Sequence, residues 1–89
     1  MKTLSENIIK VGDSFYRVSC GENGLMSVSS ALVNEEFRQI KCFGEIPKNR
    51  KSFSISENGN EHIILIGGLS DAIFATEIYR FTISSRTWV

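Results

Sequence analysis

Residue types that would mark a metal site or a disulfide framework are scarce in this sequence. It contains one histidine and two cysteines among its 89 residues. His62 has no cysteine or second histidine at ligand spacing, so we expect no metal site. Cys20 and Cys42 form no Cys-x-x-Cys pair, and we expect reduced thiols packed as small hydrophobic side chains rather than a disulfide.

An excess of charge of one sign is also absent. Ten Lys and Arg residues balance ten Asp and Glu residues, so the summed charge does not steer the protein toward nucleic acid or an anionic membrane surface. The densest basic run, residues 48–51, follows the only proline and is interpreted as a solvated loop rather than a phosphate contact. We therefore expect neither a nucleic-acid partner nor a membrane partner.

Long apolar runs are missing as well. The first seven residues lack the apolar stretch of a secretory signal, and no later run approaches the roughly 18 residues of a membrane span. These absences predict a cytoplasmic or nuclear protein.

Catalytic motifs are lacking too. The sequence has no Gly-x-Ser-x-Gly elbow, and its carboxylates are scattered at expected turns rather than paired for acid/base chemistry. Residues 67–70 are glycine-rich but lack the Gly-Lys-Ser/Thr ending of a phosphate-binding loop. We therefore expect no enzyme activity and no cofactor.

The chain does contain many short segments with apolar residues at every second position. Hydrophobic residues make up 42% of it and charged residues 22%, which is typical of a soluble globular domain. The alternation predicts half-buried β-strands. Residues 29–40 are the best helical candidate, but their β-branched and aromatic content favours strand pairing. The expected strands are residues 7–11, 14–20, 25–31, 36–42, 51–56, 62–66, 76–82 and 87–89.

Turn residues between these segments predict antiparallel hairpins. Gly12-Asp13 separates the first two segments, and Asn58-Gly59 is a strong hairpin signal before residues 62–66. That last segment is continuously apolar after its histidine, which predicts a strand buried on both faces. Residues 43–50 are expected as a connection and residues 69–75 as a longer loop. The chain is therefore predicted to be all-β, with four strands on either side of the connection.

A repeat is visible in this arrangement. Phe37 and Trp88 lie roughly 50 positions apart, and each closes a unit of four expected strands. A period of this length is typical of β-propellers, which are built from four-stranded blades.

The second unit resembles the kelch family of β-propellers. Gly67-Gly68 follow the apolar strand, and Phe81 and Trp88 come later in the family's order. Residues 44–50 match the glycine, proline and arginine spacing found between kelch blades. Residues 37–89 carry the resemblance, while residues 5–36 fit as a degenerate unit, with Tyr16-Arg17 near the double-glycine position and Ser30 in place of the aromatic.

The resemblance implies two four-stranded antiparallel blades, residues 5–43 and 44–89, of a partial kelch propeller. It implies a non-catalytic module that binds a partner protein through the loops between strands. The residues expected to build the scaffold are Gly44, Pro47, Gly67, Gly68, Tyr79, Phe81 and Trp88. The residues expected to contact the partner are Lys48, Arg50, Ser70, Asp71 and Phe74. For Phe74, burial against the adjacent loop is the competing interpretation.

Other classes remain open at this point. Two blades leave apolar faces uncovered, which implies a truncated product, a fragment or self-association. One alternative is a fragment of an oxidase-like enzyme built on a kelch propeller, and another is a stand-alone small β-sandwich or barrel. The sequence does not identify the partner.

Overall fold

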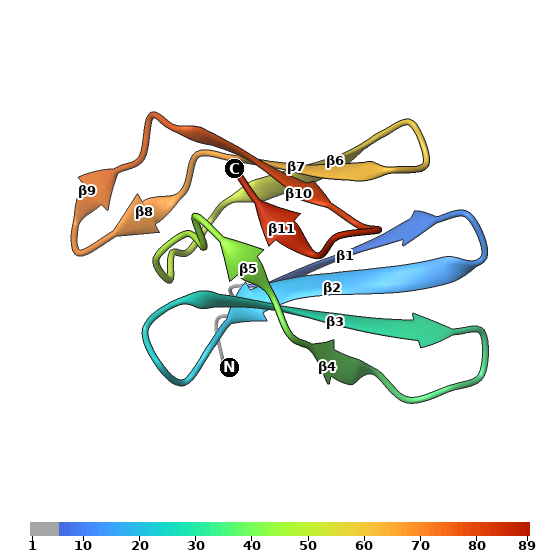
Figure 1. Ribbon diagram of the computed structural model, residues 1–89. Helices are drawn as coiled ribbons and strands as arrows, with labels where there is room; N and C mark the ends of the chain where they lie inside the picture. The colour runs from blue at the N-terminus through green and yellow to red at the C-terminus, as the bar shows by residue number, and fades with distance from the viewer. Residues whose placement is uncertain (1–5) are drawn as a thin grey trace.

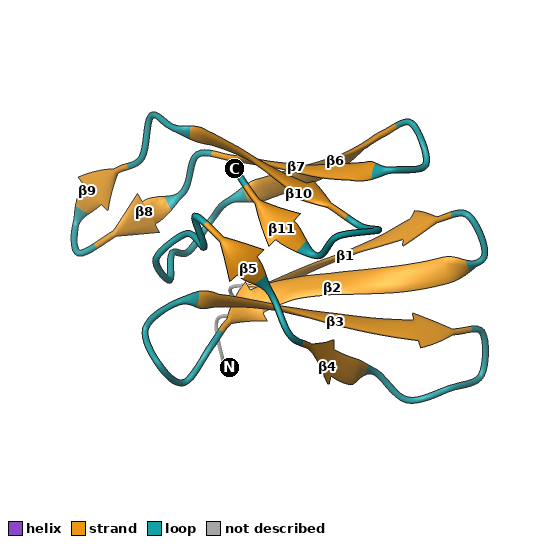
Figure 2. Ribbon diagram, in the orientation of Figure 1, coloured by secondary structure: helices purple, strands orange, loops and turns teal. Residues whose placement is uncertain are grey.

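The computed structural model describes residues 6–89, which form β-strands joined by turns, without a helix (Figure 1, Figure 2). The all-β prediction is confirmed. This part of the chain forms three sheets: one four-stranded and antiparallel, one five-stranded and mixed, and one two-stranded.

The four-stranded sheet, which we call the first sheet, comes from the N-terminal half of the chain. Its strands pair in chain order: β1 (Glu6–Val11), β2 (Ser14–Cys20), β3 (Met26–Leu32) and β4 (Arg38–Ile40). Gly12 takes a φ of 63° in the predicted turn between β1 and β2. The fourth strand is shorter than expected. The turn that contains Asn34 (φ 67°) is followed by two unpaired residues, and the strand begins only after Phe37.

The five-stranded sheet, the second sheet, has the order β5-β11-β10-β7-β6. Its strands are β5 (Phe43–Gly44), β6 (Ser54–Asn58), β7 (His62–Ile66), β10 (Ile78–Thr82) and β11 (Thr87–Trp88). The short strand β5 lies within the expected connection and was not predicted; it pairs with β11 in parallel. Gly44 lies opposite Trp88 with a φ of 85°, and a Cβ there would collide with the Trp88 carbonyl oxygen. Glycine is therefore required at this edge.

The expected loop at residues 69–75 is instead a small hairpin, formed by β8 (Leu69–Ser70) and β9 (Ile73–Phe74). Asp71 and Ala72 have φ values of 53° and 64°, which are typical of a type I′ turn. Two backbone hydrogen bonds between Leu69 and Lys51, of 2.8 and 2.9 Å, attach the base of the hairpin to the connection. Figure 1 shows the hairpin projecting away from the second sheet.

The hydrophobic core lies between the first and second sheets, which face each other as two layers (Figure 1). Its fully buried side chains are Val18, Val28, Ile63, Leu65, Phe81 and Trp88. The Trp88 ring lies 5.1 Å from the Phe81 ring and 6.4 Å from the Tyr79 ring, in an edge-on contact with the latter. These aromatic contacts join β10 to β11 within the second sheet.

The prediction that residues 62–66 are buried on both faces is wrong. Ile63 and Leu65 point into the core, whereas Ile66 is exposed and Ile64 is half-buried. The outer face of the second sheet, which includes Ile66 and its exposed neighbour Ile78, has no layer over it within residues 6–89. A continuous apolar run therefore identified the strand correctly but overstated its burial.

The expected match between Phe37 and Trp88 is also wrong. Trp88 of β11 pairs with the buried Phe81 of β10. The corresponding pair in the first sheet is Ile40 of β4 with Val28 of β3. Ile40 thus holds the position that corresponds to Trp88. By the same register Tyr16-Arg17 lie within β2 rather than after it, so they do not correspond to Gly67-Gly68.

Candidate functional site

All five residues expected to contact a partner line one pocket, with a volume of ≈ 340 Å³. The pocket lies between the connection that precedes β6 and the β8–β9 hairpin. Its full lining is Lys48, Arg50, Ser70, Asp71, Ile73, Phe74, Ala75, Thr76 and Glu77. We call it the hairpin pocket. Sequence reasoning missed Ile73, Ala75, Thr76 and Glu77, although Ile73 stands next to Phe74 in the expected loop.

Arg50 is the most enclosed charged residue of the hairpin pocket. Its side chain is 5% exposed, so the prediction that residues 48–51 form a solvated loop is wrong for this residue, although Lys48 and Lys51 are exposed. The Arg50 Nε donates to the Lys48 carbonyl at 3.0 Å and Nη1 to the Gly67 carbonyl at 3.4 Å. Its guanidinium carbon lies 5.3 Å from the centre of the Tyr79 ring. Carbonyl dipoles and an aromatic face, rather than a carboxylate of residues 6–89, therefore compensate this buried cation.

The double glycine allows the chain to pass over Arg50. Gly67 and Gly68 have φ values of 72° and 105°. A Cβ on Gly68 would lie 3.1 Å from the Arg50 side chain and 3.0 Å from the Lys51 carbonyl oxygen, whereas one on Gly67 would meet nothing within 4 Å. The close neighbours of Gly68 are thus Arg50 and Lys51 of the segment that precedes β6.

The connection is anchored to the first sheet on the other side of the pocket. Pro47 is fully buried, and its carbonyl accepts a hydrogen bond from the Met26 N–H at 2.9 Å. The Asn49 side chain donates to the Gly21 carbonyl at 2.7 Å and accepts from the Gly21 N–H at 2.9 Å. These bonds hold Lys48 and Arg50 in place between the two sheets.

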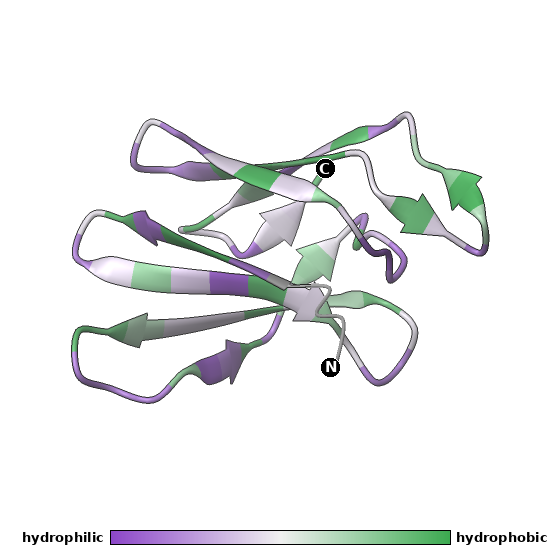
Figure 3. Ribbon diagram, turned by 180° about the vertical axis from the view of Figure 1, so that it is seen from behind, coloured by the Kyte–Doolittle hydropathy of each residue, from purple (hydrophilic) through white to green (hydrophobic). Residues whose placement is uncertain are grey.

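The outer wall of the hairpin pocket is apolar and open to solvent. Ile73 and Phe74 are 70% and 78% exposed, which makes them the two most exposed large hydrophobic residues of the described chain. Burial of Phe74 against the adjacent loop, the competing interpretation, is therefore wrong. Figure 3 shows hydrophobic colouring on both strands of the projecting hairpin. The pocket thus combines the buried Arg50 and an exposed apolar edge with the exposed charges of Lys48, Asp71 and Glu77.

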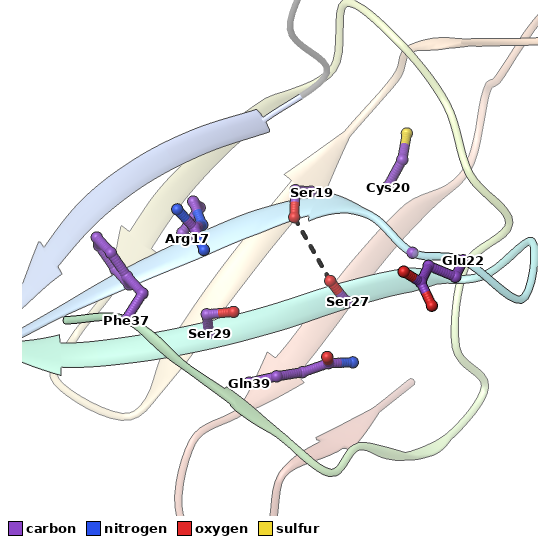
Figure 4. A pocket seen from close by; sticks show the side chains of 9 residues that line it. Arg17, Ser19, Cys20, Glu22, Ser27, Ser29, Phe37 and Gln39 are labelled. Carbon is purple, nitrogen blue, oxygen red and sulfur yellow. Dashed lines mark hydrogen bonds between the residues drawn. The ribbon is translucent and has the colours of Figure 1, made fainter.

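A second pocket, of ≈ 410 Å³, was not anticipated from the sequence (Figure 4). Its lining is Arg17, Ser19, Cys20, Gly21, Glu22, Ser27, Ser29, Phe37 and Gln39. It lies on the face of the first sheet opposite the core, because these strand residues alternate with the buried Val18 and Val28. We call it the serine pocket. Its only signal in the sequence is the series of serines at alternate positions of β2 and β3.

The two cysteines are free thiols in different surroundings. Cys20 is exposed and its Sγ donates to the Arg50 carbonyl at 3.4 Å, whereas Cys42 is half-buried beside the core. Burial raises the pKa of the Cys42 thiol above its ordinary value, and the nearby Trp88 indole, the Val28 backbone and the Arg86 charge offset the increase only in part.

Within residues 6–89, no three His, Cys, Asp or Glu side chains gather into a group that could hold a metal ion. The same stretch of chain contains no helix of the length and hydrophobicity needed to cross a membrane.

No known protein family and no curated protein matches this chain.

Proposed function

We propose that the chain is a two-blade segment of a kelch-type β-propeller, with blades at residues 5–43 and 44–89, and that it serves as a non-catalytic protein-binding module. Each of its main sheets contains four consecutive antiparallel strands, interrupted in the second by the β8–β9 hairpin. The first strands of the two units, β1 and β6, lie beside each other. A side-chain hydrogen bond from Asn7 to the Phe53 carbonyl, of 2.9 Å, joins the segments there. Adjacent strands of this kind would line a propeller axis.

The hairpin pocket is the observation that carries the proposed binding function. Exposed aromatic and aliphatic side chains are the usual anchors of protein interfaces, and Phe74 and Ile73 supply both at the pocket edge. Lys48 and Arg50 add positive charge beside them, and Asp71 and Glu77 add negative charge. The pocket therefore suits a partner segment with an apolar side chain flanked by charged ones.

The rigidity of Arg50 in the pocket floor favours binding of the partner segment. Arg50 is held by two carbonyl oxygens and the Tyr79 ring, so its remaining N–H groups are oriented before binding. Pre-organised groups lose little side-chain entropy on association.

The alternative is a stand-alone β-sandwich. It is favoured by the two sheets that face each other across one core, because this arrangement also defines a sandwich. Size-exclusion chromatography with light scattering separates the two. A sandwich is a stable monomer at low concentration, whereas a two-blade segment with an uncovered apolar face self-associates.

Selection of peptides from a random phage library on the immobilised chain tests the binding function. We expect the selected peptides to carry a charged residue beside an apolar one, and Phe74→Ala to weaken their binding at least about ten-fold. Phe43→Ala is the matched control, because Phe43 is also an exposed phenylalanine but does not line the pocket. Peptides that bind the Phe74→Ala variant as tightly as the parent would refute the assignment of this pocket.

A further inference from the structure

The serine pocket is built by short polar side chains in the middle of a sheet. Arg17 of β2 pairs with Ser29 of β3, which pairs with Gln39 of β4, and in the next row Ser19 pairs with Ser27. Because serine side chains are short, the centre of this face is recessed relative to the longer side chains around it. The result is a hollow with a floor of hydroxyl groups (Figure 4).

Two polar side chains are enclosed in this hollow. Ser29 is only 6% exposed, and Figure 4 shows its hydroxyl pointing along the floor toward Ser27. The buried Nε of Arg17 has no hydrogen-bond partner in the described chain, and the guanidinium carbon of Arg17 lies 4.5 Å from the centre of the Phe37 ring. Buried polar groups in native proteins are normally paired, so this unpaired donor beside an open hollow points to a ligand that completes the site.

The charges of the pocket define the kind of ligand. Arg17 and Glu22 are its only two charged lining residues, they have opposite signs, and Figure 4 shows them at opposite ends. The row of Arg17 and that of Ser19 lie about 7 Å apart, and Glu22 lies beyond the second row. A molecule with a single charge would be satisfied at one end only. A ligand with both charges, separated by several atoms, matches both ends.

We propose that the serine pocket binds a small amino-carboxylate. Its carboxylate accepts hydrogen bonds from the Arg17 guanidinium and the Ser29 hydroxyl, and its ammonium group lies at Glu22. The hydroxyls of Ser19 and Ser27, which are 3.4 Å apart, and the Gln39 amide line the path between the two ends. This site lies on the first sheet and does not depend on the protein-binding function of the hairpin pocket.

Titration of the intact chain with 6-aminohexanoate, followed by the backbone amide NMR signals of Ser27 and Ser29, tests the proposal. Hexanoate and hexylamine, which carry one charge each, are the comparison probes. We expect 6-aminohexanoate to bind at least about five-fold more tightly than either. Hexylamine binding as tightly as 6-aminohexanoate would overturn the role of Arg17, and hexanoate binding as tightly would overturn that of Glu22.

Three variants and one control sharpen the test. Arg17→Gln should weaken 6-aminohexanoate binding at least about ten-fold, and Ser29→Ala, a small change within a strand, several-fold. Glu22→Gln should abolish the preference for 6-aminohexanoate over hexanoate. Lys10→Gln is the matched control, because Lys10 carries the same charge above the Phe15 ring but does not line the pocket. The proposal fails if the Ser29→Ala variant binds as the parent does, or if Lys10→Gln weakens binding as much as Arg17→Gln.

Discussion

Substitution of the two adjacent glycines separates backbone strain from crowding at the hairpin pocket. Gly67 and Gly68 both have positive φ, so alanine at either position is forced into a conformation that costs an L-residue about 1–2 kcal/mol. A Cβ on Gly67 meets no atom within 4 Å, and Gly67→Ala should cost that strain alone. The variant therefore serves as an internal reference for its neighbour.

Gly68→Ala should cost considerably more. Its Cβ would lie 3.0 Å from the Lys51 carbonyl oxygen and 3.1 Å from Arg50 carbons, which is closer than ordinary van der Waals contact. Neither neighbour moves easily, because Lys51 is held by its bonds to Leu69, and Arg50 is held by carbonyl groups and buried. Overpacking of a well-packed site costs about 1–3 kcal/mol. Added to the strain, this gives a loss of about 2–5 kcal/mol for Gly68→Ala.

Urea unfolding followed by the fluorescence of Trp88, the only tryptophan, measures both losses. With a denaturant slope of about 1 kcal/mol/M, Gly68→Ala should unfold at least about 1 M below Gly67→Ala. The displaced Arg50 should also weaken peptide binding at the hairpin pocket. Equal midpoints for the two alanine variants would refute the conclusion that Gly68 is required by the close approach of the connection.

Four further predictions concern single side chains. Asn49→Ala removes both hydrogen bonds to Gly21 and should lower the free energy of unfolding by about 2 kcal/mol; an unchanged urea midpoint would contradict this. Ala72→Gly relieves a φ of 64° and produces the Asp-Gly pair favoured in type I′ turns, so the melting temperature should rise by about 3 °C, and a decrease would show that the turn is not strained. Because burial raises the pKa of Cys42, its thiol should react with iodoacetamide more slowly than that of Cys20 at pH 8. Because its pKa is raised in the folded state, Cys42 contributes stability below its ordinary pKa of 9.0, and this contribution is lost as the pH rises through the folded-state pKa. Over this pH range the free energy of unfolding, measured with urea, should therefore fall less for Cys42→Ala than for the parent.

The strands and their order could be predicted because their signals are local. Because side chains alternate along a strand, Tyr16 and Val18 lie on one face of β2, and Arg17 and Ser19 lie on the other, whatever surrounds them. Glycine and asparagine at the turns then fix where the chain reverses, and hairpin geometry makes neighbouring strands antiparallel. The eight expected strands are all present, with boundaries shifted by a few residues.

Part of the hairpin pocket could be predicted for a similar reason. In an antiparallel unit the loop after the second strand and the connection before the first emerge at the same end, so Lys48, Arg50 and Phe74 come together by topology alone. The serine pocket could not be found in this way. It depends on which face of the first sheet is left open, and alternation distinguishes the two faces of a sheet without showing what covers each one.

The sequence by itself determined an all-β chain of two four-stranded units, because strand periodicity and turn chemistry act over a few residues. Tertiary structure decided everything that depends on a distant neighbour. Trp88 is buried and Ile66 exposed, although both lie in apolar strand patterns, because the first sheet covers only the inner face of the second. Arg50 is buried within a basic run because Gly68 and Tyr79 close over it. Burial is a property of pairs of surfaces, and a strand pattern describes only one of them.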